Sequence, residues 1–354
     1  MTKKIGVLWS VLTATGKVSN AGNYLICERG KELLETLLEE DLKFNYIERT
    51  KHFADEYDGY IILGGPIISR RIHHQSRIIE ESILDKKKPI ICLGLGISGT
   101  KIYDETKYFL DDDSIRFWKY VYGTSELFSV RDIITRKILN QYGINAVLTG
   151  CPALYNIRAH NTTDNKLEGK KRKILISIPH FLLNFSLKGN LSRIKPFVLT
   201  LYFLYRMKKK LGNFEIGLVY QHGCDTVLMK IIDYFAKKNG MSSHYYVGKS
   251  LDSPELAQYD VHIGTRLHSH INFLSQKKPS YLLNVDMRTD SFLKTIRTPH
   301  QDFTFSGTRK LVNLLFDNLS RDDFSEFNAV SDEILKLYVV MKEFIQKIPM
   351  AFHD

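Results

Sequence analysis

The feature that most constrains the fold is the alternation of short apolar runs with longer segments of helical periodicity. Each apolar run has the length of a buried strand, and each helical segment carries apolar residues on one face. This β-α-β order predicts a parallel sheet covered by helices on both faces. In the first half of the chain the predicted strands are Ile5–Trp9, Tyr60–Leu63, Pro89–Leu93, Leu127–Val130 and Ala146–Leu148, and the predicted helices are Asn23–Glu39, Arg70–Leu84, Ser114–Tyr122 and Ile133–Tyr142.

The alternation stops once and then restarts. The segment Arg158–Lys173 is polar and has no apolar periodicity, which is typical of a linker. The chain has 354 residues, more than one hydrophobic core usually serves. After the break, strands are predicted at Ile174–Ile178, Ile216–Tyr220, His244–Val247, Val261–Ile263 and Tyr281–Val285, and helices at Phe197–Leu211, Thr226–Asn239, Leu267–Gln276 and Arg309–Asn318.

We therefore predict an α/β protein with two doubly wound, Rossmann-like domains and a cleft between them. The expected domains are residues 1–160 and 174–325, joined by a linker at 161–173 and followed by a C-terminal helical segment, 326–354. In that last segment the helix Asp332–Lys347 carries an apolar stripe that has to pack on the protein. Because ligands of such sheets bind beyond the carboxyl ends of the strands, the site is expected in the cleft.

The net charge of +11 is concentrated in one segment, residues 166–210, which has twelve Lys and Arg and one acid. Such a segment favours an anionic partner: a phosphate-rich substrate, a nucleic acid or a membrane surface. Its aromatic residues cluster on a helix and form no sheet platform for bases, so we expect no nucleic acid. Within 195–210, an apolar run followed by a basic cluster is either a core helix with a solvated end or a peripheral membrane contact.

The cysteines and the N-terminus indicate where the protein works. Cys27, Cys92, Cys151 and Cys224 stand singly, without the spacing of a metal knuckle. The stretch Met1–Trp9 is interpreted as a first strand and not as a signal peptide. We expect a cytoplasmic protein with free thiols, in contact with the inner face of the membrane if the basic segment binds lipid. No metal or cofactor is expected to be obligatory.

Two glycine-containing turns follow predicted strands. Gly64-Gly65 comes directly after Tyr60–Leu63, where glycine permits a sharp turn and the close approach of a ligand. In the second turn, Asn20 or Asn23 is expected to cap the following helix, and Gly22 would let a substrate hydroxyl or phosphate approach. Tight turns without a ligand explain both segments equally well.

Two further strand ends carry polar residues suited to binding. Arg131 ends a strand and precedes Asp132, a natural helix cap, so its guanidinium is expected to point into the cleft, where it suits a carboxylate or phosphate. A pair with Asp132 is the alternative. His222 and Asp225 lie on the loop after Ile216–Tyr220 and could bind sugar hydroxyls or cap the next helix.

The segment Gly264–His270 gives the strongest signal. It follows a short strand and opens an apolar helix, which places Arg266 at the helix N-terminus, where the helix dipole favours anions. His268 lies in the first turn, where the same dipole disfavours the imidazolium unless a bound anion offsets it. His268 is therefore a candidate acid–base group. His270 is expected to lie on another face of the helix.

Taken in order, these residues resemble the polysaccharide pyruvyl transferase family. The stretches that carry the resemblance are Asn20-x-Gly22-Asn23, Tyr57–Gly65, Ser129–Asp132 with Thr135, Thr149–Leu154, Thr265–His268, and Pro279 with Asp286-Met287-Arg288. Together they span the chain from about Val7 to about Arg288. Two positions depart from the pattern of many members, which have Asp where this chain has Asn23 and Cys151.

The resemblance implies a fold like that of the glycosyltransferase-B class and a reaction that uses phosphoenolpyruvate. The product would be a pyruvate ketal on a sugar of a cell-surface polysaccharide or its precursor, which is nucleotide-linked, lipid-linked or polymeric. Arg131, Arg266 and Leu267 would bind the donor and His268 would act as the acid. On the acceptor side, or elsewhere in the cleft, the resemblance and the motifs place Asn20, Gly22, Asn23, Gly64, Gly65, His222, Asp225 and Arg288.

A nucleotide-sugar-dependent glycosyltransferase of the same two-domain architecture is the alternative function. Such an enzyme would hold the ribose with an acidic residue and the diphosphate with a basic one. Release of phosphate from phosphoenolpyruvate or of UDP from a UDP-sugar distinguishes the two reactions.

Overall fold

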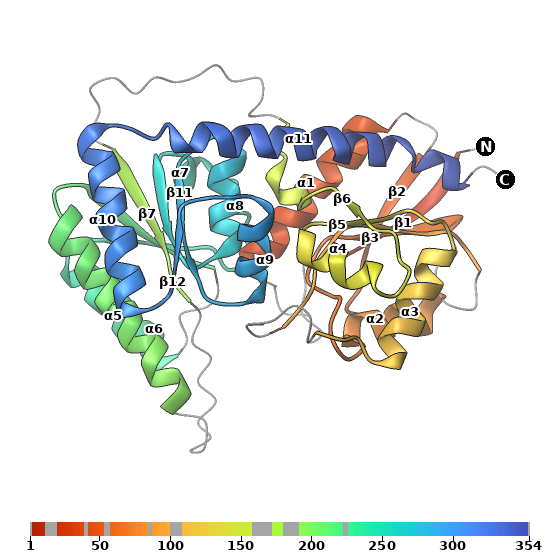
Figure 1. Cartoon of the computed structure of the whole chain (residues 1–354), viewed down its shortest axis with the longest axis horizontal. Helices are drawn as coiled ribbons and strands as arrows, with labels where there is room; N and C mark the ends of the chain where they lie inside the picture. The colour runs from red at the N-terminus through yellow and green to blue at the C-terminus, as the bar shows by residue number, and fades with distance from the viewer. Residues whose placement is uncertain are drawn as a thin grey trace.

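The structure is a computed structural model. It describes residues 2–10, 20–38, 42–52, 57–83, 87–99, 108–157, 172–179, 191–221 and 226–352, with the side chains of 191–193 left out. Its described residues form two six-stranded sheets, and the pairings between their strands are parallel. The predicted α/β class with two Rossmann-like sheets is therefore confirmed (Figure 1).

The N-terminal sheet has the strand order β2-β1-β3-β4-β5-β6. All five predicted strands are present, and the helices lie close to their predicted bounds. One strand, β2, was not predicted: it lies at the edge of the sheet, where its residues are mostly only partly buried, and its apolar residues are interspersed with polar ones. The elements are β1 Lys3–Trp9, α1 Ala21–Leu37, β2 Leu42–Glu48, β3 Gly59–Leu63, α2 His74–Ile83, β4 Ile90–Leu95, α3 Asp112–Gly123, β5 Phe128–Val130, α4 Ile133–Asn140, β6 Val147–Leu148 and the 3-10 turn η3 Pro152–Leu154.

The C-terminal sheet has the strand order β12-β11-β10-β7-β8-β9. Its five predicted strands are again present, while the short edge strand β12 and the helices α7 and α9 were not predicted. The elements are β7 Lys173–Ser177, α5 Leu191–Leu211, β8 Glu215–Tyr220, α6 Val227–Lys238, β9 Ser242–Tyr245, α7 Pro254–Ala257, β10 Val261–Gly264, α8 Leu267–Ser275, β11 Ser280–Asn284, α9 Met287–Thr295, β12 His300–Asp302 and α10 Phe305–Arg321.

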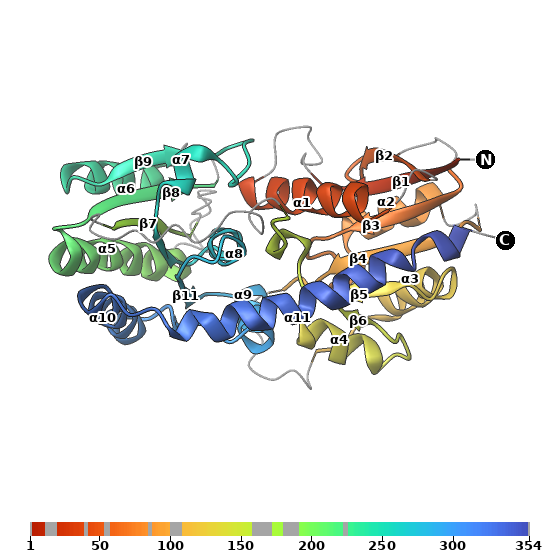
Figure 2. The ribbon, with the colours of Figure 1, turned by 90° about the horizontal axis from the view of Figure 1, so that it is seen from above.

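The last long helix, α11 (Glu326–Gln346), runs along both domains, followed by the 3-10 turn η6 (Pro349–Phe352) (Figures 1 and 2). It begins before the predicted Asp332, and its apolar stripe is buried through residues such as Ile334, Met341 and Phe344. The stripe therefore ties the C-terminal end of the chain back to the first domain. None of the helices described here combines the length and apolar character that a membrane span requires.

Each sheet has one position where the strand order reverses. In the first sheet the chain moves from β1 to β2 at one edge and then returns to β3 on the other side of β1. In the second it moves from β7 through β8 to β9 and returns to β10 on the other side of β7. Ligands of doubly wound sheets bind at the carboxyl ends of the strands beside such a reversal. The segments that follow β1 and β10, with Gly22 and His268, occupy these positions.

Candidate active site

Two helix N-termini from different domains meet at the centre of the molecule. Asn20 caps α1 by accepting hydrogen bonds from the backbone N–H groups of Gly22 (2.9 Å) and Asn23 (3.3 Å). The imidazole of His268, in the first turn of α8, lies against the Cα of Gly22, so closely that a Cβ at that position would overlap the ring. Gly22 therefore admits the histidine of the other domain, and its role in the approach of a substrate hydroxyl or phosphate stays a prediction.

The start of α8 is anchored by a buried chain of hydrogen bonds. The Arg266 backbone N–H donates to Ser177 Oγ (3.1 Å), which contacts His262 Nε2 (2.9 Å). His262 Nδ1 contacts Ser280 Oγ (2.7 Å), and Ser280 Oγ contacts His270 Nδ1 (2.7 Å). Because all of these side chains are buried, the chain fixes the position of the α8 N-terminus relative to β7, β10 and β11.

His262 and His270 are thus structural residues. His270 also contacts Thr298 Oγ1 through Nε2 (3.1 Å), and burial lowers its pKa well below the ordinary value. His270 lies on another face of α8 than His268, as predicted. His262 could not be predicted as a structural residue, because a single histidine in a strand forms no motif.

Arg131 presents two unpaired guanidinium nitrogens to the site. Its side chain is 4% exposed and lies across Gly96, where a Cβ would overlap Nε. The Nε atom contacts Asp132 Oδ2 at 3.4 Å, while Nη1 and Nη2 have no hydrogen-bond partner within the described part of the chain. Burying charged nitrogens without hydrogen-bond partners costs free energy, so Nη1 and Nη2 are suited to an anionic ligand. The alternative of an ion pair with Asp132 is present in the structure, but this pair uses only the Nε atom of the guanidinium.

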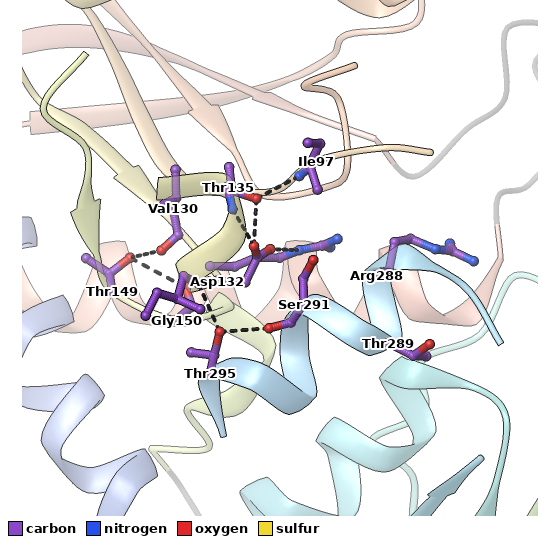
Figure 3. Close-up of polar contacts among 12 residues, drawn as sticks. Ile97, Val130, Asp132, Thr135, Thr149, Gly150, Arg288, Thr289, Ser291 and Thr295 are labelled. Atoms are coloured by element: carbon purple, nitrogen blue, oxygen red, sulfur yellow. Dashed lines mark hydrogen bonds and ion pairs between the residues drawn. The ribbon is translucent and has the colours of Figure 1, made fainter. Parts of the chain in front are cut away.

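Asp132 is committed to the backbone around it. Its Oδ1 accepts from the N–H (2.7 Å) and the hydroxyl (2.8 Å) of Thr135, as a helix cap does. Thr135 Oγ1 in turn accepts from the backbone N–H of Ile97 (3.0 Å), as Figure 3 shows. These bonds fix the β5–α4 turn and with it the backbone that carries Arg131.

The α9 helix brings a third arginine to the same site. The N-terminal end of α4 faces α9, and the Ile133 N–H donates to Thr295 Oγ1 across the domain boundary (2.9 Å) (Figure 3). Arg288, in the first turn of α9, donates to Asp286 Oδ2 through Nε (3.0 Å) and Nη2 (2.5 Å). Its charge acts on both Arg266 and His268. The structure therefore groups Arg288 with the predicted donor-binding residues.

The cluster strongly disfavours the imidazolium of His268 while no anion is bound. Burial is the main cause of the lowered pKa, and the charges of Arg131, Arg288 and Arg266 add to it, so that the pKa falls to about 3. Burial and Arg288 also lower the pKa of Arg266 to about 10, which leaves it charged at neutral pH. The Nε2 of His268 and the Nε of Arg266 have no hydrogen-bond partner among the residues described. An anion bound here would satisfy these donors and favour protonation of His268.

The remaining predicted residues are distributed as follows. Leu267 is buried at the start of α8, and Asn23 is half-buried in α1. Gly64 and Gly65 both have positive φ, but the space beside them holds Ile26 and Arg49, so their small size serves packing in this structure. Arg49 donates to the carbonyls of Leu63 (2.9 Å) and Gly64 (2.8 Å). His222 and Asp225, also predicted for the cleft, lie outside the described residues.

Two other features lie near the site without joining it. Cys151, one of three free and buried cysteines in the described chain, is 1% exposed, and burial raises the pKa of its thiol. A cavity of about 210 Å³ lies at the far end of α8 from His268, lined by residues including Leu154, Leu274 and Tyr338. None of the site arginines lines it, so this cavity is separate from the arginine cluster.

Solved structures share the fold across nearly the whole chain. S. aureus MnaA, solved with UDP, has a TM-score of 0.57 at 12% identity, and the match covers 98% of this chain and 96% of that one. The UDP-GlcNAc 2-epimerase of Neisseria meningitidis, bound to UDP-GlcNAc, has a TM-score of 0.54 at 10% identity, covering 98% and 99%. Anabaena HepE, in complex with UDP and glucose, has a TM-score of 0.53 at 10% identity, covering 98% and 98%. At these identities the likeness shows the GT-B-like fold alone.

Sequence comparison gives the family. No curated protein matches the chain significantly. A family model for polysaccharide pyruvyl transferases matches residues 20–237, more than half of the chain, from the Asn20 cap through α6. The match includes Arg131 and ends before Arg266 and His268, which the fold brings to the same place. The chain belongs to the polysaccharide pyruvyl transferase family.

Proposed function

We propose that the protein transfers the three-carbon group of phosphoenolpyruvate to a sugar and forms a pyruvate ketal. The observation that supports this most is the buried, unpaired edge of Arg131 beside Arg266, Arg288 and His268. Three guanidinium groups match a ligand that carries both a phosphate and a carboxylate. The neighbouring imidazole offers the acid that enol ether chemistry needs.

In this proposal the donor's own charge prepares His268. A bound trianion offsets the three arginines, which raises the pKa of His268 and lets the imidazole hold a proton. The protonated Nε2 then gives that proton to the methylene carbon, and positive charge develops at the adjacent carbon. One sugar hydroxyl attacks there and returns a proton to His268.

The second hydroxyl completes the ketal. It forms the second C–O bond as the C–O bond to phosphate breaks, and its proton leaves with the phosphate. The methylene becomes a methyl group, so one hydroxyl proton ends on carbon and the other on phosphate, which balances the reaction. Arg131, Arg266 and Arg288 would stabilise the carboxylate and the departing phosphate.

The test is an incubation with phosphoenolpyruvate and a panel of sugars, nucleotide sugars and lipid-linked sugars. We expect phosphate release that depends on the acceptor, and a product heavier than the acceptor by pyruvate minus one water. A parallel incubation with UDP-sugars tests the glycosyltransferase alternative. UDP release with no use of phosphoenolpyruvate would overturn the proposal.

A further inference from the structure

The helices α5 and α6 expose apolar side chains to solvent along parallel stripes. On α5, Ile194, Val198 and Tyr205 are 51%, 43% and 49% exposed. On α6, Val227, Ile231 and Tyr234 are 57%, 43% and 67% exposed. Successive spacings of four and seven residues on α5, and of four and three on α6, place each set on one side of its helix. The two helices pack against each other, so the stripes form one surface.

These stripes are additional to the faces that pack on the sheet. The opposite side of α5 is already buried through Leu199, Phe203, Leu204, Met207 and Leu211, and that of α6 through Met229, Ile232 and Ala236. A helix that only covers the core needs no second apolar face. The interpretation of 195–210 as a core helix with a solvated end therefore explains the buried half of α5 and leaves the exposed half unexplained.

Basic residues surround the exposed stripes. Between Ile194 and Lys238 the sequence has eight Lys and Arg and three acids. Of the acids, Asp233 pairs with Lys237 (2.8 Å) and Glu215 with Lys173 (2.8 Å). The exposed lysines gather at the C-terminal ends of both helices: Lys208, Lys209 and Lys210 on α5 and Lys237 and Lys238 on α6.

We propose that this surface, the α5–α6 face, docks on an anionic lipid bilayer. The face consists of Ile194, Val198, Tyr205, Val227, Ile231 and Tyr234 with the lysines just named. Apolar residues would enter the headgroup boundary, tyrosines would lie at its level, and lysines would contact anionic headgroups. Phe305, 48% exposed and in edge contact with Tyr202 at 5.0 Å between ring centroids, extends the face onto α10.

The position of the face agrees with the site. α5 and α6 follow the parallel strands β7 and β8, so their N-terminal ends lie at the carboxyl edge of the sheet, where β10 leads to Arg266 and His268. Figures 1 and 2 show α5 at the outer side of the C-terminal domain. If the proposed function is correct, this placement favours a lipid-linked acceptor. Bilayer binding itself does not depend on that function.

Charge decides between a bilayer and the other occupants. In a dimer formed through this face, two identical surfaces with a net charge of +5 each would meet and repel each other. A nucleic acid would use the lysines but would leave the exposed aliphatic side chains in water. An anionic bilayer satisfies both parts of the face.

Flotation of the full chain with vesicles tests the proposal. We expect binding to phosphatidylcholine vesicles that contain phosphatidylglycerol, and at least about tenfold weaker binding to phosphatidylcholine alone. Val198→Glu with Ile231→Glu should weaken binding at least about tenfold, and so should Lys208→Glu with Lys209→Glu. Val339→Glu and Lys342→Glu on α11 are the matched controls, because both positions are exposed there, and they should bind as the wild type does.

Three results would overturn the proposal. The first is equal recovery with anionic and neutral vesicles. The second is vesicle binding that the Val198→Glu/Ile231→Glu variant retains and that duplex DNA abolishes by competition. That result would indicate a nucleic acid site. The third is a dimer in solution that this variant dissociates, without vesicle binding. Ketal formation on a soluble acceptor is measured separately, so failure of the docking surface and failure of the proposed function are distinguishable.

Discussion

The imidazole of His268 lies against the Cα of Gly22, and this contact joins the first turn of α8 in one domain to the first turn of α1 in the other. Gly22→Ala should displace the ring or separate the two helix N-termini, since overpacking costs about 1–3 kcal/mol. We expect kcat for ketal formation to fall at least about tenfold.

The matched control is Gly123→Ala at the end of α3, where an added Cβ meets no atom within 4 Å. It should leave kcat unchanged. Equal activity of both variants would mean that the ring position does not matter.

Arg131 and Arg266 should not be replaceable by lysine without loss of donor binding. Lys cannot reproduce a bidentate guanidinium contact. Arg131→Lys and Arg266→Lys should therefore each lower kcat/KM for phosphoenolpyruvate about 30- to 150-fold, which corresponds to a loss of about 2–3 kcal/mol of transition-state stabilisation. Arg116→Lys, at a side chain 66% exposed on α3, is the control. Wild-type kcat/KM in both site variants would place the donor elsewhere.

His268 should be essential for proton transfer. His268→Gln should lower kcat by about 10²–10⁴-fold while phosphoenolpyruvate still binds, because the arginines remain. In D₂O the wild-type product should carry deuterium in the ketal methyl group, seen by mass spectrometry.

The control for this experiment is His74→Gln, at an exposed position of α2. His270→Ala cannot serve, because that side chain is buried and bonded to Ser280 and Thr298, so its loss should destabilise the fold. Retention of more than about a tenth of kcat in His268→Gln would contradict the assignment.

Donor binding should take up a proton. In the free protein the pKa of His268 is about 3, so the imidazole is neutral at pH 8, where the donor phosphate, with a second pKa of about 6, is fully ionised. A bound trianion raises the His268 pKa. Calorimetry in buffers of different ionisation enthalpy should therefore show net proton uptake. His268→Gln should bind without uptake, and uptake of the same size in that variant would assign the proton to another group.

The free energy of unfolding should decrease as the pH falls below about 6.5. The pKa values of His262 and His268 are lowered to about 3 and that of His270 also lies well below its ordinary value, all mainly by burial. A histidine in the unfolded chain has a pKa of about 6.5, so below that pH the unfolded chain binds protons that the folded chain does not. The stability that these neutral histidines allow is therefore complete above about pH 6.5 and is lost as the pH falls. The slope is up to about 4 kcal/mol per pH unit for three groups.

Urea unfolding between pH 6.5 and 5 measures this slope. His262→Asn should reduce it by about one proton, even if the variant is less stable at every pH. An unchanged slope would show that His262 does not titrate in this window.

The sequence alone determined the element types and the site segments. Buried strands such as β3 and β4 are continuous apolar runs, and the helices between the strands carry apolar periodicity, so local pattern and burial agree. The strands it missed, β2 and β12, lie at sheet edges, where partial exposure permits polar residues and weakens the pattern. Arg131, Arg266 and His268 could be predicted as site residues because ligands of such folds bind beyond the strand ends.

The tertiary structure decided which of these segments meet. Gly22 and His268 lie far apart in the chain, and only the packing of α1 against α8 shows that the glycine receives the histidine. Likewise, the low pKa of His268 comes from burial and from arginines on three separate segments, which no local pattern contains. Contacts between distant segments depend on how two sheets and their helices bury a common core, and that arrangement is a property of the whole chain.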